Sequence, residues 1–166
     1  MTPLIALAAV LAMMLGELWR SKTNERTLIH RGAIEIQDPV FRVMRVAYPG
    51  IFVAMAVEGF VRGAEADVVV LAGVGLMVAA KALKLWAIAS LGHRWSYRVL
   101  VLPDEPLVTS GPYRWMRHPN YVGVIGELLA MALMTHAVIA GPWGTVLFAL
   151  LLSQRIRVEE RAMRIR

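Results

Sequence analysis

The stretch SGPYRWMRHPNYVGVIGELLAMAL, residues 110–133, joins a polar cluster directly to a long apolar run. Pro119 suits the first turn of a helix, where its missing N–H group leaves no hydrogen bond unmade, and His118 then falls near the N-cap. The stretch therefore predicts a helix that enters an apolar medium from a polar surface. A plain membrane helix with interfacial Tyr, Trp and Arg anchors is the alternative at this point.

Composition indicates that the medium is lipid. Of the 166 residues, 58% are apolar and 18% are charged, whereas a soluble domain carries about 25% charged residues. The mean hydropathy is +0.57. Cysteine is absent, which excludes disulfides, thiolate metal sites and cysteine nucleophiles. The length allows one domain, 1–166, most of which is used for membrane spans.

Five segments are candidates for crossing the membrane, which takes about 20 mostly apolar residues. They are residues 3–19, 43–61, 68–91, 121–139 and 142–153. Pro49 should kink the second or shift its start, and Lys81 and Lys84 in the third must snorkel or face a polar cavity. The fifth spans only if it continues past Arg155. Because period-2 alternation is absent, the fold class predicted is all-α: an integral membrane helical bundle with about five transmembrane helices, the last two forming a helical hairpin.

The distribution of positive charge predicts the orientation. If all five segments span, seventeen of the eighteen Lys and Arg residues fall on one side, which should be the cytoplasmic side. The N-terminal segment lacks the basic n-region of a secretory signal, so we expect it to be a retained first helix with its N-terminus outside. Topology thus explains the net charge of +6, and no nucleic-acid partner is needed.

Three features of the polar cluster favour a binding site over simple anchoring. Gly111 and Pro112 force a turn that presents Tyr113 back towards the helix start. Gly123 and Gly126 thin one helix face, which leaves room for a ligand or a closely packed neighbour. The helix N-terminus itself offers free N–H groups and a positive dipole end that suit a carboxylate.

A second polar motif, RIRVEE, occupies residues 155–160. Arg155 and Glu159 share a helix face at i, i+4 spacing. An amphipathic helix end with surface ion pairs, each of little energetic value, is the alternative. Because ionisable groups close to an apolar span are expensive and usually functional, Arg155 and Glu159 are predicted to be functional, and Glu160 with less support.

Together, GPYRWMRHPNYVG and, about thirty residues later, RIRVEE resemble the isoprenylcysteine carboxyl methyltransferase family. The resemblance covers residues 91–166 and includes LVTSGPY ahead of the first motif. It implies an integral-membrane enzyme that uses S-adenosylmethionine without a Rossmann domain and without a metal. The chain would then divide into a three-helix membrane scaffold, 1–91, and a cofactor-binding and catalytic region, 92–166.

The resemblance also implies roles for individual residues. Arg155 matches the catalytic arginine that addresses the anionic oxygen of the acceptor. The residues that match cofactor contacts are Glu105, Pro106, Leu107, Val108, Tyr113, His118, Pro119, Asn120, Tyr121 and Glu159. The family also places a polar side chain near Arg98, but the spacing of RVLVLPDEP differs there, so Arg98 is assigned no role.

The acceptor is predicted from WAIASLGHRWSYRVLVLP, residues 86–103. This segment is similar to a bacterial branch associated with type III polyketide synthases, whose members O-methylate alkylpyrones and alkylresorcinols. His93, Arg94 and Trp95 lie where the head group of such a lipophilic acceptor would dock, although interfacial anchoring explains them equally well. The resemblance thus implies an O-methyltransferase of the bacterial inner membrane whose active site faces the cytoplasm.

Other functions stay open on the sequence alone. The acceptor could instead be a prenylated cysteine carboxylate, another lipid or a small thiol. A non-catalytic membrane protein that retains the fold, such as a small transporter, is an alternative of a different class. A transporter should show inverted repeats, and no internal repeat is found. The sequence makes no prediction of oligomeric state.

Overall fold

Five helices make up most of the computed structural model, which describes residues 2–103 and 105–163. They are α1 (Thr2–His30), α2 (Pro39–Val61), α3 (Val68–Leu91), α4 (Pro119–Thr135) and α5 (Ala140–Met163). Two short strands, β1 (Ile34–Glu35) and β2 (Leu100–Val101), pair antiparallel, and two 3-10 turns are η1 (Gly92–Arg94) and η2 (Gly111–Arg114). The predicted all-α class is confirmed.

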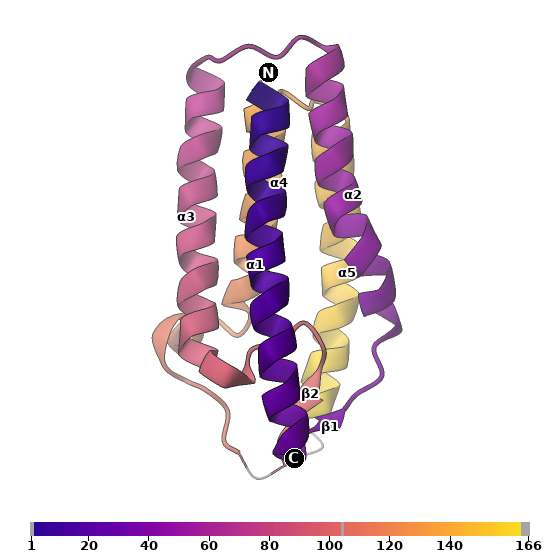
Figure 1. The fold of residues 1–166 in the computed structure, drawn as a ribbon, viewed down its shortest axis with the longest axis vertical. Coiled ribbons are helices and arrows are strands. Elements are labelled where there is room, and N and C mark those ends of the chain that lie inside the picture. Colours follow the sequence, from indigo (N-terminus) through magenta and orange to yellow (C-terminus); the bar gives the residue numbers. More distant parts are fainter. Residues whose placement is uncertain (1, 104, 164–166) are drawn as a thin grey trace.

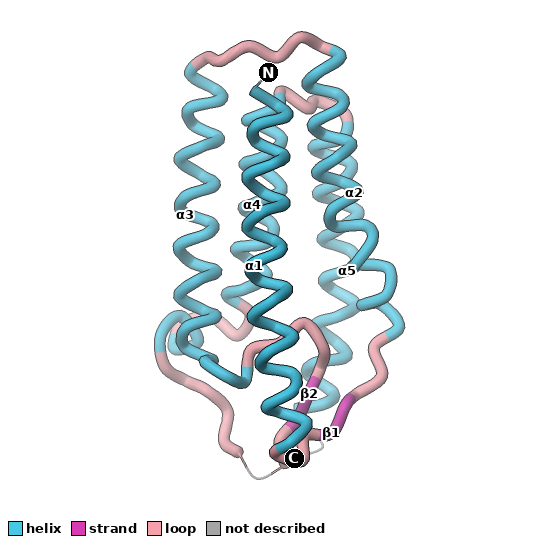
Figure 2. The backbone as a smooth tube through the Cα atoms, viewed as in Figure 1, coloured by secondary structure: helices cyan, strands magenta, loops and turns pink. Residues whose placement is uncertain are grey.

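The five helices stand side by side with their long axes nearly parallel (Figure 1). The N-terminus and the α2–α3 connection lie at one end of the bundle. The two strands and the long α3–α4 connection lie at the other (Figure 2), which we call the loop end. Helices α4 and α5 form the predicted hairpin, joined by a turn in which His136 adopts a left-handed conformation (φ 51°).

The helix bounds agree with the predicted spans in part. Helix α3 covers the predicted residues, and α5 continues past Arg155, which was the condition for a fifth span. Helix α1 continues to His30 instead of ending at Trp19. Helix α2 starts at Pro39, where the Asp38 carboxylate accepts hydrogen bonds from two N–H groups of the first turn, and Pro49 lies inside it without ending it.

The first three helices identify an integral membrane protein. Within the described residues, α1, α2 and the helix from Val68 to Arg94 are long and apolar enough to cross a membrane. Large apolar side chains such as Leu15, Val46 and Leu71 are exposed on their outer faces. Lipid is the solvent in which such faces are stable, because exposed apolar area on this scale is disfavoured in water.

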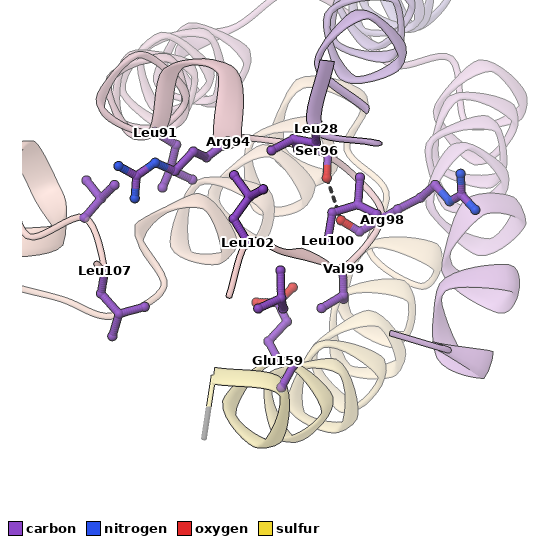
Figure 3. Close-up of a pocket in the computed structure, with 13 residues that line it drawn as sticks. Leu28, Leu91, Arg94, Ser96, Arg98, Val99, Leu100, Leu102, Leu107 and Glu159 are labelled. Atoms are coloured by element: carbon purple, nitrogen blue, oxygen red, sulfur yellow. Dashed lines mark hydrogen bonds between the residues drawn. The ribbon is translucent and has the colours of Figure 1, made fainter. Parts of the chain in front are cut away.

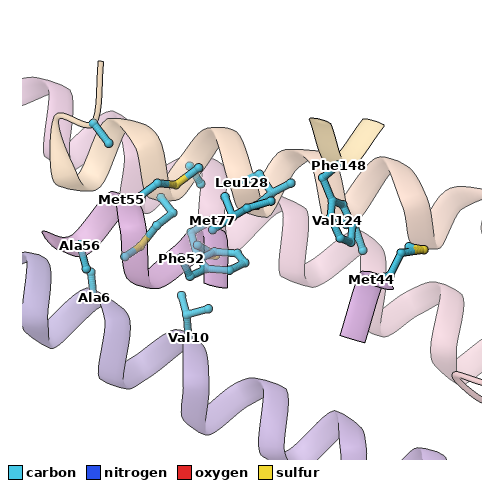
Figure 4. Close-up of a cluster of buried hydrophobic side chains, with 14 of the residues drawn as sticks. Ala6, Val10, Met44, Phe52, Met55, Ala56, Met77, Val124, Leu128 and Phe148 are labelled. Atoms are coloured by element: carbon cyan, nitrogen blue, oxygen red, sulfur yellow. The ribbon is translucent and has the colours of Figure 1, made fainter. Parts of the chain in front are cut away.

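The interior is filled by apolar side chains from several helices (Figure 4). Phe52 and Met55 of α2 and Leu128 of α4 are fully buried in this core. Helices α3 and α4 approach closely because α4 presents small residues: a Cβ atom on Gly126 would lie 2.8 Å from that of Ala80. The thin face predicted on α4 is therefore occupied by a neighbouring helix, as is common in membrane bundles.

Four charged side chains meet inside the bundle, and each is less than 10% exposed. Lys81 Nζ lies 2.8 Å from Glu17 Oε1 and 3.0 Å from Glu127 Oε1. Lys84 Nζ lies 2.7 Å from Glu17 Oε2 and 3.2 Å from Glu127 Oε1. We call Glu17, Lys81, Lys84 and Glu127 the charge quartet. Tyr48 of α2 joins it by donating a 2.5 Å hydrogen bond to Glu127 Oε2.

The sequence anticipated half of this cluster. Lys81 and Lys84 were expected to snorkel or to face a polar cavity, and the structure shows that they face buried carboxylates instead. Glu17 and Glu127 were not singled out. The signal was present, because each is the only charged residue within its predicted span, 3–19 or 121–139.

Removing one charge of the quartet should destabilise the protein strongly. Glu127→Gln leaves two ammonium groups facing one carboxylate in a buried site, and breaking such a pair costs about 3–5 kcal/mol. Thermal unfolding of the purified protein in detergent measures the loss. Glu65→Gln in the exposed α2–α3 connection is the matched control, expected to change stability by less than about 0.5 kcal/mol. Equal effects of the two variants would contradict the stabilising role of the quartet.

Candidate active site at the loop end

A cavity of about 560 Å³ opens at the loop end, between the α3–α4 connection and α5. We call it the main cavity. Seven of the residues predicted to hold the cofactor line it: Leu107, Val108, Tyr113, His118, Asn120, Tyr121 and Glu159. Trp95, predicted on the acceptor side, lines it as well. Residues far apart in the sequence are thus brought to one space.

Other predicted residues lie outside the described lining of this cavity. The Glu105 carboxylate pairs with Arg94, at 2.8 Å from Nε, and with Arg31. The Pro106 carbonyl accepts a 2.6 Å hydrogen bond from Arg94 Nη1. These contacts hold the chain just before Leu107. His93 is exposed to solvent, and its ring contacts the guanidinium of Arg31. Pro119 is buried in the first turn of α4.

The polar cluster has the local structure that its sequence predicts. Gly111 has a φ of 61°, and a Cβ atom there would lie 2.0 Å from Ser90 Oγ, so η2 docks directly on α3. His118 is the N-cap residue of α4, and Pro119 occupies the first turn. The His118 ring stacks on Tyr121, with centroids 5.6 Å apart and an interplanar angle of 12°. The turn and the helix start therefore present Tyr113, His118 and Tyr121 to one cavity.

The α5 side of the main cavity is acidic. His118 Nδ1 lies 3.7 Å from Glu159 Oε2, and its Nε2 lies 3.6 Å from Glu160 Oε1. Burial and the Glu159 carboxylate raise the pKa of Tyr113 well above its usual value, so its phenol stays protonated. Asn120 Oδ1 is buried with no hydrogen-bond partner among the described residues. The cavity thus offers two carboxylates and an unused acceptor to an entering group.

Arg155 lies beneath this acidic side and makes polar contacts with four other residues, and its side chain is 7% exposed. Its Nε donates to the Tyr121 hydroxyl at 2.8 Å and to Glu159 Oε1 at 3.1 Å. Its Nη1 lies 3.2 Å from Asp38 Oδ2, and its Nη2 donates to the Tyr97 carbonyl. The described lining of the main cavity does not include Arg155; it includes Tyr121 and Glu159, which Arg155 holds.

Sequence reasoning missed two members of this group, Tyr97 and Asp38. Asp38 uses both of its carboxylate oxygens. One oxygen caps α2 through Val40 N and Phe41 N, and the other faces Arg155. The sequence signal was QDPV, an Asp directly before a Pro that opens a helix. That pattern predicts the cap. The contact with Arg155 depends on the α1–α2 connection folding back across α5, which no local pattern reports.

A smaller pocket of about 200 Å³ adjoins the main cavity and shares Leu107, Val108 and Glu159 with it. Its wall is largely apolar, and Figure 3 shows Leu28, Leu100, Leu102 and Glu159 around the same space. Arg98 lines this pocket too, with its guanidinium paired to the carboxylate of Glu35 on β1. The two cavities therefore adjoin, and both have apolar side chains in their walls.

The sequence profile of the isoprenylcysteine carboxyl methyltransferase (ICMT) family matches residues 73–165, more than half of the chain. The polar cluster and RIRVEE, the motifs that carried the resemblance, lie within this match. The chain therefore belongs to this family of methyltransferases. The match includes most of α3 and all of α4 and α5, whereas α1 and α2 lie outside it.

Individual relatives show how far the similarity extends. Uncharacterized protein YpbQ of Bacillus subtilis (strain 168) is 29% identical over 159 residues, which are 96% of this chain and 95% of YpbQ. Protein-S-isoprenylcysteine O-methyltransferase of Saccharomyces cerevisiae is 36% identical over 81 residues, 45% of this chain and 32% of the yeast protein. A probable protein-S-isoprenylcysteine O-methyltransferase of rice (Oryza sativa subsp. indica) is 31% identical over 98 residues, 55% of this chain and 49% of its own length. The finer resemblance to the polyketide-associated branch stays a prediction.

Two helix caps allow the Asp38–Arg155 contact to be tested apart from capping. Asp38 and Asp67 each accept hydrogen bonds from two N–H groups, of α2 and α3 respectively. Asn caps helices about as well as Asp, and the pairing of Asp67 with His136 at 3.3 Å is exposed and contributes little, so Asp67→Asn should cost only a few tenths of a kcal/mol. Asp38→Asn also removes a buried charge paired with Arg155 and should cost about 1.5–3 kcal/mol. Thermal unfolding in detergent compares the two, and equal losses would show that the ion pair adds nothing.

Proposed function

We propose that this protein is an S-adenosylmethionine-dependent O-methyltransferase that acts at the membrane on a lipophilic acceptor with an acidic oxygen. One observation carries the proposal. The main cavity gathers the two family motifs, far apart in the sequence, together with Leu107 and Val108. Membership of a methyltransferase family supports the reaction class.

The residues of the main cavity fit S-adenosylmethionine. Glu159 and Glu160 suit its ammonium group and ribose hydroxyls. The N-terminus of α4, beginning at Pro119, suits its carboxylate. Leu107 and Val108 offer an apolar wall for the adenine. A cavity of about 560 Å³ lies within the usual range for small-molecule sites.

The bound cofactor would supply an activated methyl group on a sulfonium, which needs neither a metal nor a covalent intermediate. The task of the chain is to hold the acceptor oxygen in line with that methyl and to exclude water. We assign the acceptor oxygen to Arg155, acting through the Tyr121 hydroxyl, whose oxygen accepts a hydrogen bond from Arg155 Nε at 2.8 Å. This hydroxyl donates to Glu159 Oε1 in the structure, so its proton must turn to the acceptor oxygen when the acceptor binds. A rigid, always charged guanidinium suits this task better than an ammonium group.

The acceptor has two candidate classes, both with a long apolar chain and an oxygen that carries an acidic proton. A long-chain alkylpyrone or alkylresorcinol is proposed from the resemblance of residues 86–103. A prenylated cysteine carboxylate is the second class, favoured by the names of the yeast and rice relatives. The smaller pocket beside the main cavity, with leucine and valine side chains in its wall, supports either. We further propose that the loop end faces the cytoplasm of a bacterial inner membrane, because the positive charge gathers there.

His118→Ala and Glu159→Ala should each weaken binding of S-adenosylmethionine. Losing a charge-assisted hydrogen bond costs about 1.5–3 kcal/mol, which is roughly a tenfold to hundredfold rise in Kd. Isothermal titration of the cofactor into purified protein in detergent measures the change. His30→Ala, at the exposed end of α1, is the control and should bind normally. Unchanged affinity in both site variants would remove the proposed cofactor site.

Arg155→Ala should separate the acceptor from the cofactor. Because the guanidinium orients the acceptor oxygen, its loss should misplace that oxygen and cost roughly two decades of kcat. Cofactor affinity should stay near normal, and Arg155→Lys should recover only part of the turnover. Methyl transfer to an alkylpyrone and to a prenylcysteine, each in detergent micelles, provides the assay. If Arg155→Ala loses the cofactor and turns over normally once saturated, Arg155 serves the cofactor site instead.

A further inference from the structure

Three polar residues on one face of α1 hold the segment that follows α3. Glu17, Ser21 and Asn24 are spaced i, i+4 and i+7, and all three face residues 92–97. Asn24 Nδ2 donates to the carbonyl oxygens of Gly92, at 3.1 Å, and of Trp95, at 2.7 Å. We call Glu17, Ser21 and Asn24 the α1 polar strip.

Within this segment, Tyr97 forms two hydrogen bonds with the α1 polar strip, one through its side chain and one through its backbone. Its hydroxyl donates to Glu17 Oε2 at 3.0 Å, and its backbone N–H donates to Ser21 Oγ at 2.8 Å. Ser21 is fully buried. Burial and the Glu17 carboxylate raise the pKa of Tyr97 far above its usual value, which keeps the phenol in the donating form.

The opposite side of the same segment faces the candidate active site. Trp95 and Ser96 line the main cavity. The remaining polar group of Tyr97, its carbonyl oxygen, accepts the hydrogen bond from Arg155 Nη2. One residue therefore connects the α1 polar strip to the guanidinium that holds Tyr121.

The connection constrains the orientation of Arg155. A guanidinium is planar, so fixing Nη1 on Asp38 and Nη2 on the Tyr97 carbonyl also fixes the direction of Nε. Nε is the atom that meets Tyr121 and Glu159. Glu17, which anchors the Tyr97 ring, is itself held by both lysines of the charge quartet, so the anchor is rigid.

We propose that Tyr97 is a positioning residue, which transmits the fixed geometry of the α1 polar strip to Arg155. The inference rests on the proposed function and assigns part of the active-site geometry to α1. Helix α1 lies outside residues 73–165 that match the family. The contribution of α1 to the active site therefore rests on the contacts seen in this chain.

Tyr97→Phe tests the link, and Tyr48→Phe is its matched control. Each variant removes one phenol-to-carboxylate hydrogen bond to the charge quartet, and the hydrogen bond of Tyr48 goes to Glu127, which is not a partner of Arg155. Both should lower the thermal unfolding temperature by similar amounts. Only Tyr97→Phe should lower kcat, by roughly tenfold as the guanidinium loses alignment, with the Kd for S-adenosylmethionine within about twofold of wild type.

A double-mutant cycle shows whether the effect runs through Arg155. Tyr97→Phe should cost much less kcat in an Arg155→Lys background than in the wild type, because the aligned guanidinium is already gone. Ser21→Ala, a milder loosening of the Tyr97 backbone, should change kcat in the same direction. It also serves as the test if Tyr97→Phe does not fold. Additive losses, or equal kcat for Tyr97→Phe and Tyr48→Phe, would overturn the proposal.

A readout that needs no turnover separates this inference from the proposed function. Amide hydrogen exchange of the peptide containing Trp95 to Val99 should rise in Tyr97→Phe and stay unchanged in Tyr48→Phe. If wild-type protein neither binds S-adenosylmethionine nor transfers methyl groups, the proposed function fails, and exchange still decides whether Tyr97 fixes the segment. If wild type binds and methylates while exchange is the same in both variants, the positioning role alone is wrong.

Discussion

The pairing of two lysines with two glutamates inside an apolar bundle is the constraint on which the rest of the structure depends. Each charge would be prohibitive alone in lipid, and each lysine of the quartet contacts both carboxylates. The cluster is neutral as a whole, so it stabilises the bundle only when all four groups are present at the same depth. Because Glu17, the two lysines and Glu127 come from α1, α3 and α4, that requirement sets the height of three helices relative to one another.

The geometry of the loop end follows from this register. Helix α4 is fixed by Glu127 and by its close approach to α3, so its first turn, two helical turns away from Glu127, has a defined position. That turn carries His118 and Tyr121, and α5 brings Glu159 against them. Arg155 then ties four separate segments together through Asp38, Tyr97, Tyr121 and Glu159. The candidate site is thus a consequence of how the spans are aligned, and its polar groups are ordered by contacts that reach back into the bundle.

The sequence predicted what depends on local pattern and missed what depends on contact between segments. The bounds of α3 and the Pro119 helix start follow from apolar length and from the special backbone of proline, and both were correct. The predicted end of α1 was too early because the run of apolar residues ends at Trp19. The helix continues to His30 through a more polar region, in which Asn24 and Leu28 contact the loop end. Glu17 and Asp38 carry no local signal for their partners, since those partners are far away in the chain. The family resemblance named most of the predicted residues that line the main cavity. It could not show that the Glu105 carboxylate pairs with Arg94 instead.

The charges of the site favour orientation over electrostatic attraction as its main contribution to the proposed reaction. Positive charge on a sulfonium disappears as its methyl passes to an anionic oxygen, so a carboxylate close to that sulfur would stabilise the ground state more than the transition state. Glu159 and Glu160 are therefore better placed at the distant ammonium and ribose groups, where the charge does not change. Arg155, already paired with Asp38 and Glu159, has little net charge left to offer an acceptor. What those pairs do give is a guanidinium with all three nitrogens fixed, and hence a Tyr121 hydroxyl oxygen whose position is set before any acceptor enters.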